Sequence, residues 1–237
     1  MFGRLHFPAL HHAAVSVIYC TVVQQGIQPP VARPDKRRDF DRLQPDARRA
    51  ALIEATLRCL RREGRDGLSA RRIGAEAGIS IGLINHYFPS KDDLVAAAYE
   101  TLAERQLAML LEAAGDGDPV ARLRGFIAAY FGPEILDRGV LRAWIVFWAM
   151  AFESEAVRAA HERSNGAFQA ALRDLMADAR GEPGEIPHLA GRATELSALL
   201  DGLWVEWCLA ETPFAPDEGR AICDRWIDRF LASPITD

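Results

Sequence analysis

The feature that most constrains the fold is a pair of short helical segments joined by a turn, within residues 69–91 (SARRIGAEAGISIGLINHYFPSK). Ser69 and Ser80 each suit the N-cap position of a helix, and Gly78 permits a tight turn between the two segments. We expect the second segment to end near Tyr87, because a proline follows two residues later. Two short helices with a glycine-containing turn match the helix-turn-helix pattern, whose second helix contacts bases in the major groove of DNA.

Apolar residues elsewhere also recur with helical spacing. Ile53, Leu57 and Leu60 mark one face of a helix that begins near Pro45 and ends at Gly64. No stretch alternates with period 2, so we expect no β-sheet. The predicted fold class is all-α, with further helices near residues 90–114, 119–131, 138–152, 154–179, 188–211 and 216–232.

Charge is distributed unevenly along the chain. Residues 1–91 carry 15 basic and 8 acidic side chains, whereas residues 92–237 carry 13 basic and 25 acidic ones. The net charge of −5 alone argues against a nucleic-acid partner, but its distribution indicates a basic module that meets a polyanion, joined to an acidic module. We predict a DNA-binding domain at 45–91 and a helical domain at 92–237, with the helix at 90–114 as the connector.

The N-terminal segment is predicted to contribute no structure of its own. Residues 13–23 form an apolar run that is shorter than the roughly 20 residues needed to span a bilayer. No clear signal-peptide cleavage site follows this run. We therefore expect residues 1–44 to form a poorly ordered extension, and we expect no association with a membrane.

Metal, cofactor and catalytic motifs are not recognisable in the sequence. The four cysteines have no metal-ligand spacing and suit the packing roles of thiols in a reducing cytoplasm; they are Cys20, Cys59, Cys208 and Cys223. No glycine-rich phosphate loop and no nucleophile motif occurs. We therefore expect a cytoplasmic protein without a metal, a cofactor or catalytic residues.

The stretch from residue 71 to residue 91 resembles the DNA-binding module of TetR-family regulators, R-x-I-A-x-x-A-G-[VI]-S-x-G-x-[IL]-x-x-Y-F-x-[SG]-K. The string GLINHYF is most similar to that of the BetI-type, choline-responsive repressors, and the resemblance extends from about residue 46 to about residue 231. It implies a three-helix DNA-binding domain followed by a helical ligand-binding and dimerisation domain. Two departures are Gly74, where a small alanine is usual, and Ile81, where the family often has threonine or lysine.

The resemblance also implies which residues bind DNA. Asn85 is the best candidate for reading a base, since asparagine can bond adenine through two hydrogen bonds. The residues implied to lie near the groove or to contact phosphates are Arg48, Arg49, Ser69, Arg71, Arg72, Ser80, Ile81, Gly82, Leu83, His86, Tyr87 and Lys91. Arg48 and Arg49 are expected before the first helix. Arg71 and Arg72 alternatively form an ordinary solvated face, and Ile84 and Phe88 are expected in the core.

Aromatic residues gather in the acidic half of the chain, which contains all five tryptophans. Trp144 and Trp148 are spaced i, i+4 and share a helix face. Tryptophan faces beside a carboxylate suit a quaternary ammonium ion, which each ring attracts by about 0.5–2 kcal/mol. The predicted ligand-binding residues are Tyr130, Trp144, Phe147, Trp148, Asp201 and Trp204. Glu153 and Glu206 are alternative counter-charges, and Phe131 and Phe152 are further candidate walls. A plain core is the alternative for the tryptophans.

Together these features predict a homodimeric repressor that a small effector releases from a palindromic operator in double-stranded DNA. Apolar positions of the helices near 188–211 and 216–232 are expected to form the dimer interface; they are Leu196, Leu199, Leu200, Leu203, Ile222, Trp226, Ile227 and Phe230. By resemblance, the effector is choline or a similar cation and the regulated genes make glycine betaine from choline. Two alternatives stay open: a TetR-like repressor that senses another metabolite or drug, and a ligand-independent DNA-binding protein with a filled C-terminal core.

Overall fold

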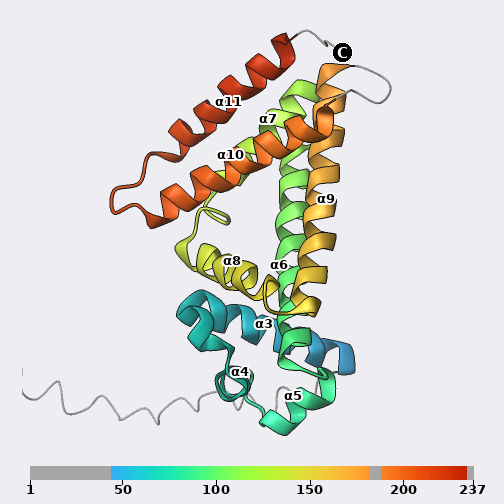
Figure 1. Ribbon diagram of the computed structural model, residues 1–237, viewed down its shortest axis with the longest axis vertical. Helices are drawn as coiled ribbons and strands as arrows, with labels where there is room; N and C mark the ends of the chain where they lie inside the picture. Colours follow the sequence, from blue (N-terminus) through green and yellow to red (C-terminus); the bar gives the residue numbers. More distant parts are fainter. Residues whose placement is uncertain (1–43, 182–187, 234–237) are drawn as a thin grey trace, which may run out of the picture. The chain divides into compact units, whose positions relative to one another are not determined.

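The computed structural model describes residues 44–181 and 188–233, and this part of the chain contains helices and no β-strand (Figure 1). The predicted all-α fold class is thereby confirmed for the described residues. The predicted extension lies outside them except for Gln44, and so does Cys20. Cys59, Cys208 and Cys223 are buried free thiols. Among the helices described here, none is long and apolar enough to cross a membrane.

The first elements form a small three-helix group with a short connecting helix. They are α3 (Pro45–Glu63), the 3-10 helix η1 (Gly64–Leu68), α4 (Ala70–Ala77) and α5 (Ile81–Tyr87). Pro45 occupies the first turn of α3, and Gly64 ends that helix with a φ of +62°, as the sequence predicts. The core of the group includes the fully buried side chains of Leu52, Leu60 and Ile73.

Helix α6 (Lys91–Ala114) begins beside α3 and runs through the length of the C-terminal helices (Figure 1). It begins with a capping box, in which Ser90 Oγ accepts from the backbone N–H of Asp93 over 3.1 Å and the Asp93 carboxylate accepts from the backbone N–H of Ser90 over 3.0 Å. One continuous helix thus contacts both α3 and helices of the C-terminal half.

Five further helices follow α6 in the described part of the chain, and the first three of them pack against it. The five are α7 (Pro119–Tyr130), α8 (Arg138–Ala151), α9 (Glu155–Arg180), α10 (Leu189–Leu209) and α11 (Pro216–Ala232). Helices α6 and α9 lie side by side, while α10 contacts α8, α9 and α11. The short polar caps Asp118, Asp137 and Ser154 each accept a backbone N–H at the start of a helix.

One local prediction differs from the structure. Ser80 does occupy the N-cap position of α5, but its side chain makes no capping hydrogen bond. Residues 64–68, for which no element is predicted from the sequence, form the 3-10 helix η1, which turns the chain between α3 and α4.

Candidate functional site

The turn between α4 and α5 is tight because glycine stands at two positions. Gly78 has a left-handed φ of +75° at the end of α4. The backbone N–H of Ile79 donates to the carbonyl oxygen of Gly74 over 2.8 Å. A Cβ at position 74 would lie 2.8 Å from the carbonyl oxygen of Ile79, closer than side chains normally approach. Glycine at 74 therefore permits this close turn, although it has a lower helix propensity than alanine.

Helix α5 presents a face of small and polar side chains to solvent. Ile84 is buried and Leu83 is half-buried, so α5 is anchored on one side. The exposed residues of the opposite face are Ser80, Ile81, Gly82, Asn85 and His86. This arrangement leaves the Asn85 amide available to a base edge, with Gly82 allowing close approach of the backbone.

Arg48 and Arg49 lie within the first turns of α3, whereas the sequence analysis placed them before the first helix. Arg48 Nη1 donates to the Tyr87 hydroxyl over 3.2 Å. Arg49 stacks over the buried ring of Phe88, with 4.3 Å between the guanidinium carbon and the ring centroid. These contacts hold the C-terminal end of α5 against α3 and keep two cationic side chains near the exposed face.

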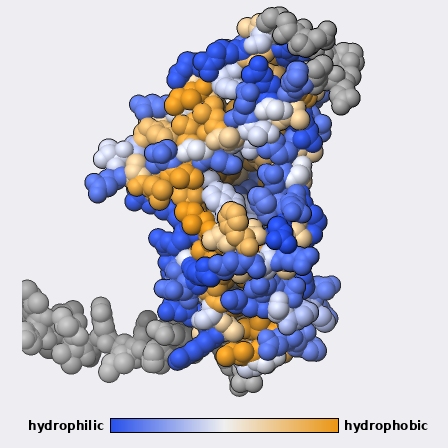
Figure 2. Space-filling view, in the orientation of Figure 1, coloured by the Kyte–Doolittle hydropathy of each residue, from blue (hydrophilic) through white to orange (hydrophobic). Residues whose placement is uncertain are grey.

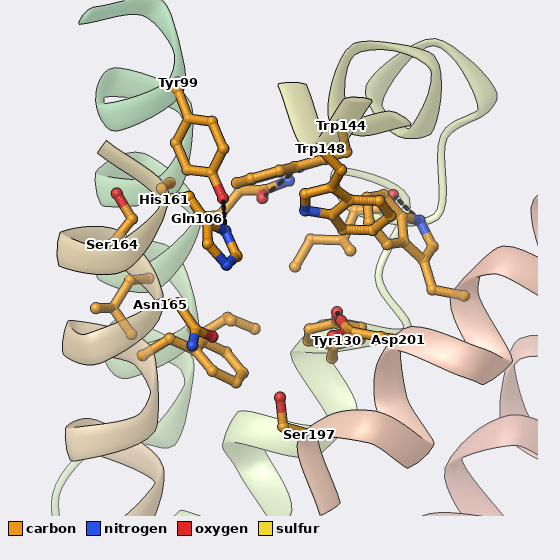
Figure 3. Close-up of a pocket in the computed structure, with 16 residues that line it drawn as sticks. Tyr99, Gln106, Tyr130, Trp144, Trp148, His161, Ser164, Asn165, Ser197 and Asp201 are labelled. Atoms are coloured by element: carbon orange, nitrogen blue, oxygen red, sulfur yellow. Dashed lines mark hydrogen bonds between the residues drawn. The ribbon is translucent and has the colours of Figure 1, made fainter. Parts of the chain in front are cut away.

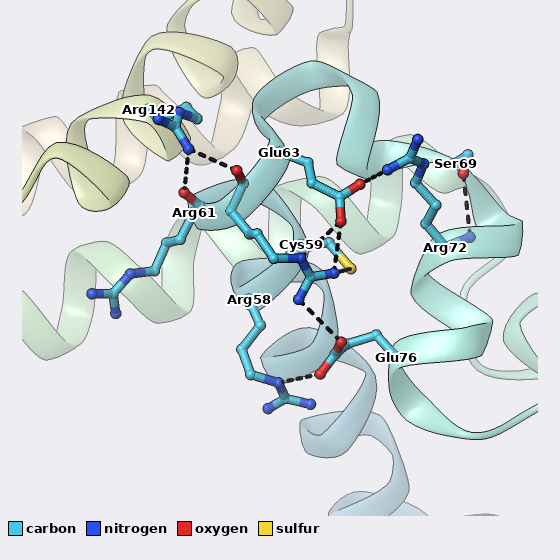
Figure 4. Close-up of polar contacts among 9 residues, drawn as sticks. Arg58, Cys59, Arg61, Glu63, Ser69, Arg72, Glu76 and Arg142 are labelled. Carbon is cyan, nitrogen blue, oxygen red and sulfur yellow. Dashed lines mark hydrogen bonds and ion pairs between the residues drawn. The ribbon is translucent and has the colours of Figure 1, made fainter.

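Arg72 differs from its neighbour Arg71 in its partners. Arg72 forms an ion pair with Glu63, and Glu63 also pairs with Arg62 over 2.7 Å (Figure 4). Glu76 of α4 in turn accepts from Arg58 over 2.8 Å. Glu63, at the end of α3, offsets the charge of Arg72. Arg72 therefore belongs to a polar network that joins α4 to α3.

Arg71, Ser69 and Lys91 remain on the outer surface of the same group. Arg71 and Lys91 are exposed, and neither forms an ion pair with another residue in the described ranges. Ser69 Oγ accepts from the backbone N–H of Arg72 over 3.2 Å, so its first role is to cap α4. Two cations are thus available to phosphates at the edges of the helix-turn-helix.

A second site lies within the C-terminal helices, where α6 to α10 enclose a cavity of about 280 Å³, here called the C-terminal cavity (Figure 3). Three tryptophans form much of one wall. Trp148 lies 6.1 Å from Trp144 and 6.2 Å from Trp204 between ring centroids. Trp144 Nε1 donates to Gln106 Oε1 over 3.1 Å, and Trp204 Nε1 donates to the carbonyl oxygen of Ile135 over 2.9 Å. These bonds fix the indole rings of Trp144 and Trp204 in place.

Asp201 supplies a carboxylate beside these rings. Its Oδ1 accepts a hydrogen bond of 2.6 Å from the Tyr130 hydroxyl, and both residues line the C-terminal cavity. Burial raises the pKa of Asp201, and the hydrogen bond from Tyr130 opposes that shift. Burial, with the nearby Asp201 carboxylate, raises the pKa of Tyr130 well above its ordinary value, so its hydroxyl stays a donor. When Asp201 is ionised, the pair presents a poorly solvated negative charge to the cavity.

The side of the cavity formed by α6 and α9 carries several polar groups among its apolar side chains (Figure 3). The Tyr99 hydroxyl lies 2.8 Å from Nδ1 of His161, and burial raises the pKa of Tyr99, which keeps the phenol protonated. Ser164 and Asn165 follow on α9 and also line the cavity. Asn165 is exposed, so the cavity reaches solvent at this side.

Comparisons with known proteins match both sites to one family. The family model of bacterial regulatory proteins of the tetR family matches residues 52–98, and that of the BetI-type transcriptional repressor C-terminal domain matches residues 119–232. The HTH-type transcriptional regulator BetI of Burkholderia thailandensis is 31% identical over 191 residues, which cover 79% of this chain and 95% of that protein. The chain belongs to the TetR family. Its C-terminal half is of the BetI type.

Solved structures agree with this assignment. A candidate transcriptional regulator from Pseudomonas aeruginosa PAO1 is 42% identical, with a TM-score of 0.73, over 82% of this chain and 95% of its own. Another, from Saccharomonospora viridis in complex with choline, is 24% identical with a TM-score of 0.65, over 78% and 97% of the two chains. As a TetR-family member, this protein is a DNA-binding transcriptional regulator of the repressor type and not an enzyme.

In this TetR-family protein, the structure brings five of the six predicted ligand-binding residues around one cavity. Phe147 is the exception: it is fully buried behind Trp144 and Tyr99 and does not line the cavity. Helix α8 is apolar on most sides, so spacing alone does not distinguish its core face from its cavity face. Phe147 therefore supports the aromatic wall from behind.

The other suggested walls and counter-charges are also corrected. Phe131 is buried and does not line the cavity. Phe152 is 89% exposed and is not part of the cavity lining, because α8 ends before it. Glu153 pairs instead with Arg65 of η1 over 3.1 Å, and Glu206 is exposed on α10. Among the described residues, Asp201 is the carboxylate that lines the cavity.

Helix α8 also connects the cavity to the DNA-binding helices. Arg142 Nη1 donates to the carbonyl oxygens of Arg61 over 3.0 Å and Arg62 over 2.7 Å, at the end of α3 (Figure 4). Asp137, at the start of α8, pairs with Arg61 over 3.2 Å. The helix that carries Trp144 and Trp148 thus bonds directly to the first helix of the helix-turn-helix domain.

The sequence analysis missed the polar side of the cavity. Tyr99, Gln106, His161, Ser164 and Asn165 were not singled out, because isolated polar residues in amphipathic helices usually face solvent. The signal available was the i, i+3, i+4 spacing of the last three residues on α9, which places them on one face. Their partner helices cannot be identified from spacing.

Proposed function

We propose that this TetR-family regulator is a homodimeric repressor that choline, or a similar quaternary ammonium ion, releases from a palindromic operator. The observation that carries the proposal is the group of Trp144, Trp148 and Trp204 around one cavity with the Asp201 carboxylate. A quaternary ammonium ion has no hydrogen-bond donor on nitrogen, so aromatic faces and a counter-ion are its natural ligands. The names of the BetI relatives and the choline complex of the S. viridis protein support this choice of ligand.

The ligand-independent alternative requires a filled C-terminal core. The structure contains a cavity of about 280 Å³ there, so a ligand-sensing role fits it better. A quaternary ammonium ion would have cation–π contact with several rings, at about 0.5–2 kcal/mol for each. The genes under control would make glycine betaine from choline, in keeping with the BetI-type relatives.

DNA binding is assigned to the exposed face of α5 and its cationic edges. Asn85 would read a base, and Arg71 and Lys91 would bind phosphates, which fix the register of the protein on DNA. Arg48 would reach the backbone together with Tyr87, to which it is hydrogen-bonded. Two such helices, one from each subunit, would occupy half-sites about 34–36 Å apart.

The dimer would form through α10 and α11. Four of the eight apolar residues considered for it, Leu196, Leu200, Ile227 and Phe230, are buried within the chain. The four that remain half-buried at the surface are Leu199, Leu203, Ile222 and Trp226. Figure 2 shows hydrophobic surface over α10 and α11, which a second subunit would cover.

Titration of the intrinsic tryptophan fluorescence tests the ligand. Choline should change the emission of the wild-type protein, whereas its neutral isostere 3,3-dimethyl-1-butanol should not at the same concentrations. A Trp226→Phe variant, altered outside the cavity, should keep the response. Equal responses to choline and to the neutral isostere would show that the cavity does not select a cation.

A further inference from the structure

Resting on the proposed onium site, we propose that the C-terminal cavity binds a longer zwitterion, a trimethylammonium ion whose chain ends in a carboxylate. The onium group would lie at the tryptophans and Asp201, and the carboxylate would lie at His161, Ser164 and Asn165. Choline would then be a partial ligand that fills one side of the cavity.

The first argument is the separation of charge and polarity inside the cavity. Asp201 is the one acidic residue among the described residues that line it, and it lies with Tyr130 on the side of α7 and α10. The opposite side, formed by α6 and α9, presents an imidazole, a hydroxyl and an amide beside apolar side chains such as Leu107 and Phe168 (Figure 3). A cation is therefore favoured on the side of Asp201. On the side of α6 and α9, the carboxylate of a ligand would meet no acidic side chain among the described lining residues, so nothing there repels it.

The second argument is that these polar groups are available. Nδ1 of His161 is occupied by the Tyr99 hydroxyl, which leaves Nε2 without a hydrogen-bond partner in the described part of the chain. Within the same ranges, the side chains of Ser164 and Asn165 make no hydrogen bond to another residue. With Tyr99 as the donor to Nδ1, Nε2 carries the proton and can donate to a ligand. Three donors on two adjacent turns of α9 match the two oxygens of a carboxylate.

The third argument is size. A cavity of roughly 150 Å³ accommodates benzene. Choline is only slightly larger than benzene, and the cavity here holds about 280 Å³. A choline molecule seated on the tryptophans therefore leaves room for a longer chain. Because Asn165 is exposed, that chain would extend from the aromatic wall toward solvent, where a carboxylate keeps part of its hydration.

Isothermal titration calorimetry on the full-length protein tests this with three matched probes. They are 4-(trimethylammonio)butanoate, its methyl ester, and butyltrimethylammonium, which lacks the oxygen group. We expect the carboxylate to bind about tenfold more tightly than the other two, because hydrogen bonds to a charged acceptor are stronger than those to a neutral one. Asn165→Leu and Ser164→Ala should each remove much of this preference and leave the affinity for butyltrimethylammonium within about twofold.

The outcomes separate the two proposals. If neither choline, titrated alongside, nor any of the three probes binds, the proposed function itself fails; if choline alone binds, the onium site stands and the longer zwitterion is wrong. If all three bind with equal affinity, or if the ester binds as well as the carboxylate, the onium site stands and the carboxylate site is wrong. Ser197→Ala changes a cavity residue of α10 to which no contact with the carboxylate is assigned; it is the control and should leave the preference unchanged.

Discussion

Arg142 of α8 caps the C-terminal end of α3 by donating a hydrogen bond of 2.7 Å to the carbonyl oxygen of Arg62. The carbonyl groups in the last turn of a helix have no partner within the helix, so an external donor stabilises them. Trp144 stands two residues further along α8 and lines the cavity. A ligand that shifts α8 would therefore change the contact that supports the first DNA-binding helix.

Arg142→Met is expected to weaken the coupling between effector and operator. It removes the bonds to α3 while keeping much of the apolar stem, so the change in operator affinity caused by choline should fall at least about fivefold. Fluorescence anisotropy of a labelled operator, with and without choline, measures this. Arg138→Met is the matched control, because Arg138 bonds instead to the carbonyl oxygen of Ala210 within the C-terminal half. Equal losses in both variants would contradict the special role of Arg142.

Asn85→Ala is expected to relax base preference at one operator position. The substitution removes the exposed amide and with it the contacts to a base. The cost is about 1–3 kcal/mol and applies only to the preferred base pair. Binding to a set of operators with single base changes measures the preference. Lys91→Ala is the comparison: it should weaken all sequences alike and reduce the dependence of affinity on salt. An unchanged sequence profile for Asn85→Ala would refute the reading role.

Asp201→Asn is expected to stabilise the free protein and to weaken cation binding. Burial raises the pKa of Asp201, so the ionised carboxylate is disfavoured in the folded state. The group therefore favours folding most at pH values below its unfolded pKa, and that contribution is lost as pH rises through the folded pKa. At neutral pH the neutral amide of the Asp201→Asn variant should raise the thermal midpoint, which differential scanning calorimetry measures.

The same substitution has a signature in the pH dependence of binding. Wild-type affinity for choline should fall as pH falls through the raised pKa of Asp201, because protonation removes the counter-charge. The variant should bind more weakly at neutral pH and lose this dependence. Calorimetric titrations with choline across about pH 4 to 8 would reveal this difference between wild type and variant. A variant that binds choline as tightly as the wild type, with the same pH dependence, would exclude Asp201 from the site.

Trp226→Glu is expected to dissociate the proposed dimer. Trp226 is half-buried on α11 and stacks on Phe230 at 5.6 Å, so a charge there would be buried in a two-fold interface. Analytical ultracentrifugation should find a monomer with reduced operator affinity. Phe152→Glu replaces an exposed aromatic residue at the end of α8, outside α10 and α11, and should remain dimeric. A Trp226→Glu dimer would place the interface elsewhere.

Helix positions were predictable because local signals specify them. The proline at residue 45, the serine caps at residues 69 and 90 and the glycine at residue 64 all act where the sequence analysis placed them. Such signals depend on neighbouring residues within one helical turn, so they can be recognised in the sequence without knowledge of the tertiary fold.

Side-chain partners were not predictable to the same extent. The pairing of Arg72 with Glu63 depends on the crossing of α3 and α4, and the burial of Phe147 beside the exposed edge of Trp148 depends on how α8 is rotated. His161 lies 62 positions from Tyr99, and only the packing of α6 on α9 brings them together. A resemblance to a family indicates that a site exists, whereas its second, polar side follows from the fold.

Release of operator DNA by a cation is the central claim, and one measurement tests it most directly. Chromatin immunoprecipitation would identify the operator, and fluorescence anisotropy would then follow its complex with the full-length protein during titration with choline or 3,3-dimethyl-1-butanol. We predict release by choline, no release by the neutral isostere, and loss of the choline effect in Trp148→Leu with operator affinity retained. Operator binding that stays unchanged at saturating choline, or that falls equally with both compounds, would contradict the account.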